Sequence, residues 1–147
     1  MIIIKQGNLL EAPEDILVHQ VNIDGIMGGG VARQIAGKYP KTEQEYIKFC
    51  EEHDFEYENL KGKVDLTKEN GKYIANMFSQ DKYFNTNYKA MEIALEKIRG
   101  FAEQEGLTVA LPYGIGCGIA KGDFNIVLGI INQVFKNYEV TIYKLEG

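Results

Sequence analysis

Two glycine-rich segments of this 147-residue sequence have the composition and spacing of ligand-binding loops. The first holds three consecutive glycines, Gly28, Gly29 and Gly30, where an apolar strand-like run passes into a helix-like pattern. The second, "GIGCGI" (residues 114–119), also lies between a strand-like and a helix-like run. Three consecutive glycines cost conformational entropy, and a simple turn rarely needs more than one. The pattern predicts that a ligand approaches the backbone closely there.

Neither segment is a standard nucleotide-binding motif. A P-loop requires G-x-x-x-x-G-K-[ST], which neither segment contains. A dinucleotide fingerprint requires G-x-G-x-x-G, but the second segment has Ile119 in place of the third glycine. Free backbone N–H groups at the starts of two helices can still hold a diphosphate between them. The two segments therefore predict a diphosphate site without the usual fingerprint.

Two side chains near the first segment could act on a bound ligand. His19 lies in "LVHQVN", close to the strand end that leads into the glycines. Its imidazole could take a proton from water or give one to a leaving group, because a histidine pKa lies near working pH. The alternative is a histidine that packs in the strand and bonds to the backbone. Asp24, in "NIDG", could orient a water or a ligand hydroxyl, or it could simply form the turn.

Other residues near the two segments allow more than one interpretation. Cys117 stands at a helix entrance, where a thiol pKa can fall, or it is only a small loop residue. Asp123 is a catalytic candidate or the N-cap of the following helix. Phe124 lines a cavity wall or anchors that helix to the core. Gln80 and Asp81 follow a strand, and we expect them at the edge of the site.

Strands and helices alternate along the chain, and these elements must position the candidate residues. Single strands are predicted over residues 2–5, 15–22, 107–113 and 138–145, and a hairpin with an Asn-Gly turn over residues 62–78. Helices are predicted over residues 31–39, stopped by Pro40, and over 42–53, 86–106 and 123–137. This alternation favours a three-layer α/β sandwich with a largely parallel sheet. Ligands bind such sheets beyond the carboxyl ends of the strands, so both glycine-rich segments are expected on one rim.

The bulk composition is that of one globular domain spanning residues 1–147. The chain is 45% hydrophobic and 25% charged, and its net charge of −5 argues against a general binder of nucleic-acid backbones. The N-terminal apolar run is too short for a signal peptide or a membrane span. Cys50 and Cys117 have no metal-like spacing, so we assume no metal and no cofactor. Two isolated cysteines fit a reducing compartment, and the expected location is the cytoplasm.

The two segments, in "NIDGIMGGGVARQIAGKYP" and "LPYGIGCGIAKGDFNIV", resemble the ligand loops of a macrodomain, the ADP-ribose-binding module. The resemblance covers nearly the whole chain, from "KQGNLLEAPEDILVHQVN" to "VTIYKL". Within the family, the chain resembles the branch that contains the fungal ADP-ribose 1″-phosphate phosphatase and the terminal ADP-ribose protein glycohydrolase. It also resembles bacterial and phage macrodomains. The resemblance implies a three-layer α/β/α macrodomain sandwich with a mixed, largely parallel central sheet.

The resemblance also implies a ligand arrangement. Asn8 stands where many macrodomains have an aspartate that bonds the adenine amino group, and Tyr143 is placed like residues that flank the adenine. Asn22 matches an asparagine near the distal ribose, and His19 matches a histidine of the fungal phosphatase. The remaining expected ligand-binding residues are Leu9, Gly28, Gly29, Gly30, Val31, Gln80, Gly114, Ile115, Gly116, Cys117, Gly118, Ile119 and Phe124.

Three departures from the family bear on the mechanism. The glycohydrolase branch uses a lysine after a central strand, where this chain has Gln80, with Lys82 nearby but out of register. The same branch uses an aspartate in the second loop, where this chain has Ala120. Another subfamily has an acidic residue just after the glycines, where this chain has Ala32. The lysine–aspartate chemistry therefore does not transfer to this sequence.

Three functions remain open at the level of the sequence. The first is hydrolysis of an ADP-ribose derivative, most simply ADP-ribose 1″-phosphate, with His19 and Asp24 positioning or activating water. The second is a non-catalytic reader or sequestering module for ADP-ribose or a related nucleotide signal, which the missing lysine and aspartate favour. The third is removal of ADP-ribose from modified protein or nucleic acid. In each case the expected partner is ADP-ribose or a derivative and no membrane is involved, while the oligomeric state stays open.

Overall fold

The computed structural model describes residues 1–118 and 120–145, in which every predicted strand and long helix is present. Its strands are β1 (Ile2–Gln6), β2 (Ile16–Gln20), β3 (Val64–Glu69), β4 (Lys72–Met77), β5 (Val109–Pro112) and β6 (Val140–Lys144). Its helices are α1 (Gly30–Lys38), α2 (Pro40–Glu52), α3 (Tyr57–Leu60), α4 (Tyr88–Glu105) and α5 (Phe124–Val134), with a 3₁₀ turn η1 (Leu9–Glu11). The short η1 and α3 were not predicted.

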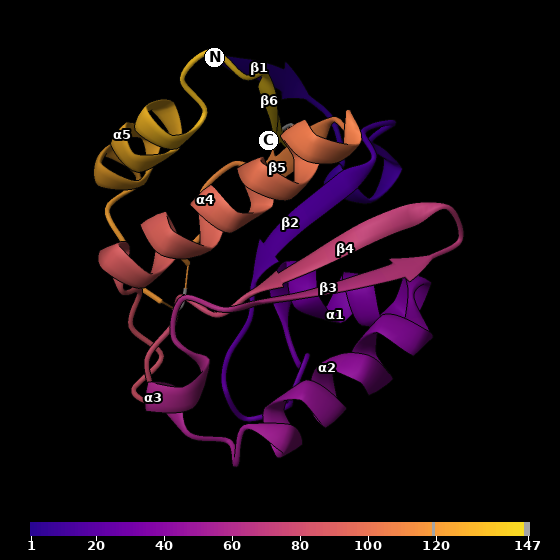
Figure 1. Ribbon diagram of the computed structural model, residues 1–147, viewed down its shortest axis with the longest axis vertical. Coiled ribbons are helices and arrows are strands. Elements are labelled where there is room, and N and C mark those ends of the chain that lie inside the picture. The colour runs from indigo at the N-terminus through magenta and orange to yellow at the C-terminus, as the bar shows by residue number, and fades with distance from the viewer. Residues whose placement is uncertain (119, 146–147) are drawn as a thin grey trace.

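The six strands form one sheet in the order β1-β6-β5-β2-β4-β3 (Figure 1). Every neighbouring pair is parallel except the β3–β4 hairpin, which is antiparallel. The prediction of a mixed, largely parallel sheet is therefore confirmed. Because the carboxyl ends of the parallel strands meet at one edge, the loops that follow β2, β4 and β5 share that edge.

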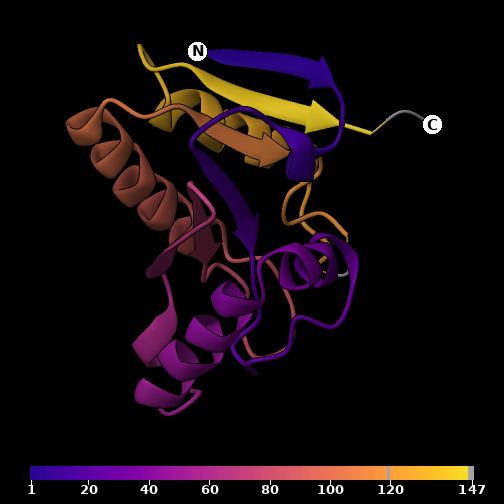
Figure 2. The same cartoon turned by 90° about the vertical axis from the view of Figure 1, so that its right-hand side faces the viewer.

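Helices cover both faces of the sheet, which makes the three predicted layers. On one face, apolar residues of α4 and α5 pack against Ile16 and Val18 of β2. On the other face, Leu17 packs with Ile35 of α1. The side chains of a strand alternate between the two faces, so His19 shares the α1 face with Leu17. In Figure 2, β1 and β6 lie at the top of the molecule and α2 lies at the bottom.

Local signals in the sequence explain where several elements begin and end. Asn70 and Gly71, with φ of 51° and 77°, form the hairpin turn between β3 and β4. Pro40 was predicted only as a stop for α1, but it also occupies the first turn of α2, where its missing N–H costs nothing. Within the described residues, every helix is too short or too polar to cross a membrane.

The C-cap of α4 offers a test of these local signals. Gly106 has a left-handed backbone with φ of 67°, so Gly106→Ala is expected to lower the free energy of unfolding by about 1 kcal/mol. Gly100 lies inside the same helix with open space around it, and Gly100→Ala is expected to raise that free energy by about 1 kcal/mol. Denaturant titrations of the two variants check the opposite signs. An unchanged free energy of unfolding in Gly106→Ala would show that the end of α4 does not depend on a left-handed residue.

Candidate functional site

Three cavities that share lining residues form one groove along the carboxyl ends of β2 and β5. The central cavity, of about 360 Å³, is lined by His19, Gln20, Gln80, Gly118, Ala120 and residues 29–32 and 112–116. The outer cavity, of about 260 Å³, is lined by Gln34, Val31 and residues 8–10, 112–113 and 143–145. The loop cavity, of about 360 Å³, is lined by Gly28, Gly29, Ile26, Ala32, Gln80, Phe84 and residues 20–22. The groove therefore runs from η1, between the two glycine-rich segments, to the loop after β2.

The N-terminus of α1 opens onto the central cavity without a side-chain cap. Gly29 is the N-cap residue, and no side-chain hydrogen bond caps the helix there. The first N–H groups of a helix have no partner within the helix, so they are available to an anion in the groove. A Cβ built on Gly29 would meet no atom within 4 Å, and the φ of −156° suits any residue. The open space beside Gly29 belongs to the central and loop cavities.

Side-chain hydrogen bonds hold the loop that leads into α1. The Asn22 Oδ1 accepts from the backbone N–H of Asp24 at 3.0 Å and lies 2.6 Å from the Tyr46 hydroxyl. The Asn22 Nδ2 donates to the Ile26 carbonyl at 2.8 Å. Asn22 therefore lines the loop cavity, but its side chain already serves the shape of the loop.

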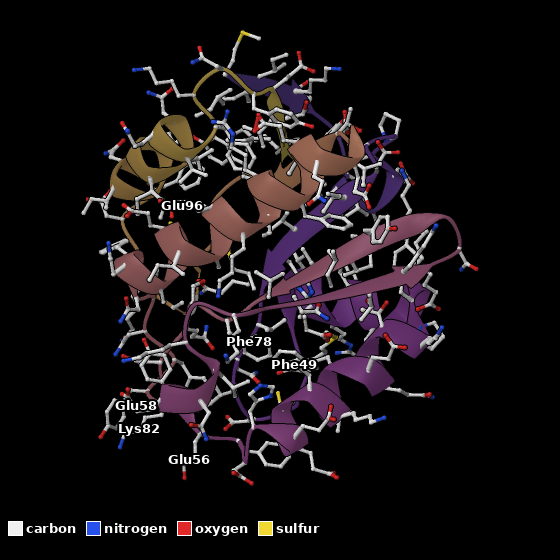
Figure 3. The ribbon with its side chains drawn as sticks, in the orientation of Figure 1. Phe49, Glu56, Glu58, Phe78, Lys82 and Glu96 are labelled. Atoms are coloured by element: carbon white, nitrogen blue, oxygen red, sulfur yellow. The ribbon has the colours of Figure 1, made fainter. Side chains whose placement is uncertain are left out.

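Aromatic residues of the core pack against the buried side of this loop. Tyr46 packs among the buried residues between the loop and α2, and its ring stacks on that of Phe78 with centroids 6.0 Å apart. The rings of Phe49 and Phe78 stack with centroids 5.4 Å apart (Figure 3). The loop therefore packs on buried aromatic rings, which connect it to α2 and to the end of β4.

The second segment is tied to the sheet by a chain of polar contacts. The Gln20 Oε1 accepts from the Ser79 hydroxyl at 2.5 Å, and its Nε2 donates to the Thr86 hydroxyl at 3.2 Å. That hydroxyl in turn donates to the carbonyl of Gly116 at 2.5 Å. A Cβ on Gly122 would lie 2.5 Å from the same carbonyl oxygen, so glycine is required there for packing. The chain just after this segment therefore needs a glycine for its own packing.

Aromatic side chains form the wall between the central and outer cavities. Tyr113 lines both cavities, and its ring lies 4.5 Å from that of Phe124. Phe124 itself lines none of the three cavities, so the structure favours its interpretation as an anchor behind Tyr113. Tyr143 lines the outer cavity and donates its hydroxyl to Glu14 at 2.7 Å. Asn8 lines the same cavity, but its side chain caps η1 by accepting from the N–H of Leu10.

His19 is buried at the floor of the central cavity, with 1% of its surface exposed. Its Nε2 lies 2.6 Å from the Oδ1 of Asn76, so its partner is a side chain and not the backbone. The other ring nitrogen, Nδ1, is buried and has no hydrogen-bond partner among the described residues. Burial lowers the pKa of His19 from 6.5 to about 4, although the bond to Asn76 opposes this shift. The imidazole is therefore neutral at physiological pH, the form in which one ring nitrogen can accept a hydrogen bond.

This shift predicts a pH dependence of stability. Between pH 6.5 and 4 the unfolded chain binds a proton at His19 that the folded protein does not bind. The free energy of unfolding should therefore fall as the pH falls through this window, by up to about 1.4 kcal/mol per pH unit. Denaturant titrations of the wild type and His19→Gln at several pH values isolate this effect. The stability advantage of the wild type should shrink on acidification, and parallel curves would contradict the shift.

The structure does not bring all the predicted residues together. Asp24 is exposed and lines a separate cavity, with residues 55–58 and 81–83, so it does not share a cavity with His19. Figure 3 shows Glu56, Glu58 and Lys82 of that separate cavity grouped around α3.

In and after the second segment, the structure distinguishes between the interpretations given for Cys117 and Asp123. Cys117 lines none of the three cavities of the groove. Its thiol lies 3.4 Å from the Ile115 carbonyl oxygen, and burial raises the thiol pKa, which disfavours a nucleophile. Asp123 caps α5 by accepting from the N–H of Asn125, as one interpretation predicted. Ile119 lies outside the described residues.

Sequence reasoning missed several residues of the groove. Asn76 contacts the His19 ring and was not proposed as a site residue. The cavity-lining residues that were also not proposed include Leu10, Gln20, Gln34, Pro112, Tyr113 and Lys144. Gln20 and Pro112 stand within two residues of the predicted strand ends, a signal that could have found them. Asn76 lies within a strand, and only the pairing of β2 with β4 brings it to His19.

Comparison with known proteins agrees with this geometry, although no protein-family model matches the chain. Over 124 residues the chain is 33% identical to the ADP-ribose 1″-phosphate phosphatase of Saccharomyces cerevisiae, covering 76% of this chain and 67% of that protein. Over 46 residues it is 52% identical to the DNA ADP-ribosyl glycohydrolase of Thermus aquaticus, covering 31% of this chain and 13% of that protein.

A solved structure extends the similarity to the whole fold. The macrodomain of Thermus aquaticus DarG is 27% identical, with a TM-score of 0.81 over 97% of this chain and 97% of that one. The sequence match to the phosphatase covers most of this chain. The sheet of this chain is also the mixed, largely parallel sheet that the resemblance implied. From its sequence similarity and its fold, this chain belongs to the macrodomain family.

Proposed function

We propose that the protein binds ADP-ribose in the groove and hydrolyses a derivative of it, most simply by releasing phosphate from ADP-ribose 1″-phosphate. The observation that carries this proposal is the uncapped N-terminus of α1, which opens between two glycine-bearing loops at the centre of a continuous groove. A diphosphate at that point would accept hydrogen bonds from free N–H groups and be favoured by the helix dipole.

The ends of the groove suit the two ends of the ligand. The outer cavity offers apolar walls, from Leu9 and Tyr143, and the polar Asn8, which fits an adenine base. The loop cavity, with Asn22 and Gln80, would take the distal ribose. Gln80 also lines the central cavity, so the 1″ substituent would point from the ribose into that cavity, which His19 lines. These assignments extend what the family resemblance implies for the same residues.

His19 supplies the chemistry in this proposal. Its neutral imidazole would take a proton from a water whose oxygen forms a new bond to phosphorus. The bond between phosphorus and the ribose 1″ oxygen breaks, and that oxygen receives the proton back from the imidazole. The yeast relative is named for this reaction, and its similarity covers most of this chain.

Removal of ADP-ribose from DNA is a second candidate. The 46-residue segment that is 52% identical to a DNA ADP-ribosyl glycohydrolase favours it. The net charge of −5 disfavours binding to DNA. This chain also has Ala120 where the glycohydrolase branch uses an aspartate. A non-catalytic reader is the third possibility, and it requires no role for His19.

One set of samples distinguishes these functions. Calorimetric titration with ADP-ribose measures binding, and single-turnover incubation with ADP-ribose 1″-phosphate measures release of phosphate. Binding of ADP-ribose with phosphate release supports the phosphatase. If ADP-ribose binds but no phosphate is released, ADP-ribosylated DNA is tested as the second substrate. Binding without turnover of either substrate identifies a reader. Absence of binding would overturn the proposal.

A further inference from the structure

A row of three polar side chains crosses the sheet beside the central cavity. His19 of β2 lies directly opposite Asn76 of β4, and Asn76 lies directly opposite Asp65 of β3. The exposed fractions of these residues are 1%, 0% and 8%, in that order. Buried polar groups cost free energy unless they are hydrogen-bonded. The row supplies its own bonds, because each residue contacts the next.

The bonds in the row have one consistent direction. The Nδ2 of Asn76 donates to the Oδ2 of Asp65 at 3.1 Å, and the Oδ1 of Asn76 lies 2.6 Å from the Nε2 of His19. Burial raises the pKa of Asp65, and the hydrogen bond from Asn76 opposes this shift by stabilising the ionised carboxylate. In that form the carboxylate only accepts hydrogen bonds, so Asn76 turns its amide nitrogen toward Asp65 and its oxygen toward His19. Since that oxygen also only accepts, the proton of the neutral imidazole resides on Nε2.

The other ring nitrogen is then left with a free lone pair. Nδ1 of His19 is buried and has no partner among the described residues, and His19 lines the central cavity. A buried acceptor without a hydrogen-bond partner costs free energy. A ligand hydroxyl or a water in the cavity that donates to Nδ1 would remove this cost. If Asn76 were reversed, its amide would donate to Nε2, the proton would move to Nδ1, and this acceptor would be lost.

We propose that Asp65 and Asn76 are positioning residues that hold His19 as the Nε2–H tautomer and so present Nδ1 as a proton acceptor to the central cavity. Asp65 acts through Asn76, because its carboxylate fixes which way the amide faces. The catalytic consequence rests on the proposed function, whereas the tautomer is a property of the free protein. The two can therefore be tested apart.

Nitrogen NMR of the protein, labelled with ¹⁵N in its histidine rings, reads the tautomer directly at neutral pH. The chain has two histidines, so His53 serves as an internal reference and His19→Gln assigns the signals. The expected spectrum shows His19 as a neutral ring with a protonated Nε2 and a bare Nδ1. A protonated Nδ1, or an imidazolium at neutral pH, would overturn the proposal without any variant.

Asp65→Asn then tests the role of the carboxylate. An amide at position 65 both donates and accepts, so it no longer dictates the direction of Asn76. A mixture of the two His19 tautomers is expected, with kcat for phosphate release reduced in proportion to the remaining Nε2–H form and KM unchanged. An unchanged tautomer, or a mixed tautomer with full kcat, would contradict the assignment.

Asp15→Asn provides the matched control. The carboxylate of Asp15 accepts from the N–H and the hydroxyl of Thr108 at 2.9 and 3.0 Å, near the amino end of β2 and away from the groove. This variant should lose some stability while keeping the His19 tautomer and the kcat of the wild type. If it shifted the tautomer as Asp65→Asn does, the effect would be general to the sheet and the positioning role would be refuted. If the NMR result stands but no turnover is found, the proposed function fails and the tautomer assignment survives.

Discussion

Replacing Gly29 with leucine is expected to weaken ADP-ribose binding by at least ~100-fold, because the new side chain occupies the space in which the diphosphate would lie. A Cβ at this position meets no atom within 4 Å, so the side chain extends into the groove without displacing the protein. The free energy of unfolding should fall by no more than about 1 kcal/mol, the usual cost of replacing a favourable N-cap residue. Calorimetric titration and denaturant unfolding of the same sample check both statements.

Gly37→Leu is the matched control for this variant. Gly37 lies in the same helix and is exposed, and a Cβ built there also meets no atom within 4 Å, but this residue lines none of the groove cavities. The variant should bind ADP-ribose like the wild type and unfold at a slightly higher denaturant concentration. Unchanged affinity in Gly29→Leu would place the diphosphate elsewhere and overturn the proposed ligand position.

Replacing His19 with glutamine is expected to reduce the single-turnover rate of phosphate release by about 10²- to 10⁴-fold, the usual contribution of a general base. Affinity for ADP-ribose should change by no more than about threefold, because the diphosphate is held by backbone groups of the loops and not by the imidazole. Glutamine is close to histidine in size and keeps a donor for Asn76, so the β2–β4 pairing should persist.

The pH profile separates a base from a structural histidine. With a pKa of about 4, His19 is already unprotonated at neutral pH, so the rate at saturating ADP-ribose 1″-phosphate should stay level between about pH 6 and 8 as far as His19 is concerned. It should fall below about pH 4, where the imidazole takes up a proton. A full rate in His19→Gln, or equal losses of rate and of ADP-ribose affinity, would contradict a role as base.

Most of the fold follows from local signals that the sequence carries. The Asn70-Gly71 turn, the end of α4 near residue 106 and the apolar runs of β2 and β5 all appear where their patterns predicted them. The omissions, η1 and α3, have three and four residues and are too short to show a helical period. Pro40 was predicted only to end one helix, although a proline also suits the first turn of the next one, so the start of α2 is a local signal as well.

The groove could be predicted only in part. Parallel strands bring their carboxyl ends to one edge, so the two glycine-rich segments were expected on one rim and lie there. The sequence could not distinguish glycines that leave room for a ligand from glycines that the chain itself needs. Gly29 faces open space, whereas Gly122 packs against the carbonyl of Gly116. A glycine that leaves room for a ligand and a glycine that the chain needs for packing look the same in the sequence.

The family, the order of the elements and the two loops could be predicted from the sequence, because these depend on motifs of residues close together in the chain. The partners of the candidate catalytic residues depend instead on how the strands pair. His19 and Asn76 are 57 residues apart, and they meet because the pairing register of β2 and β4 places them opposite each other. Asp24 lies five residues from His19 along the chain, yet the loop after β2 carries it into a different cavity. Burial and cross-strand register are properties of the assembled sheet, so the protonation state of His19 could not be predicted before the fold was known.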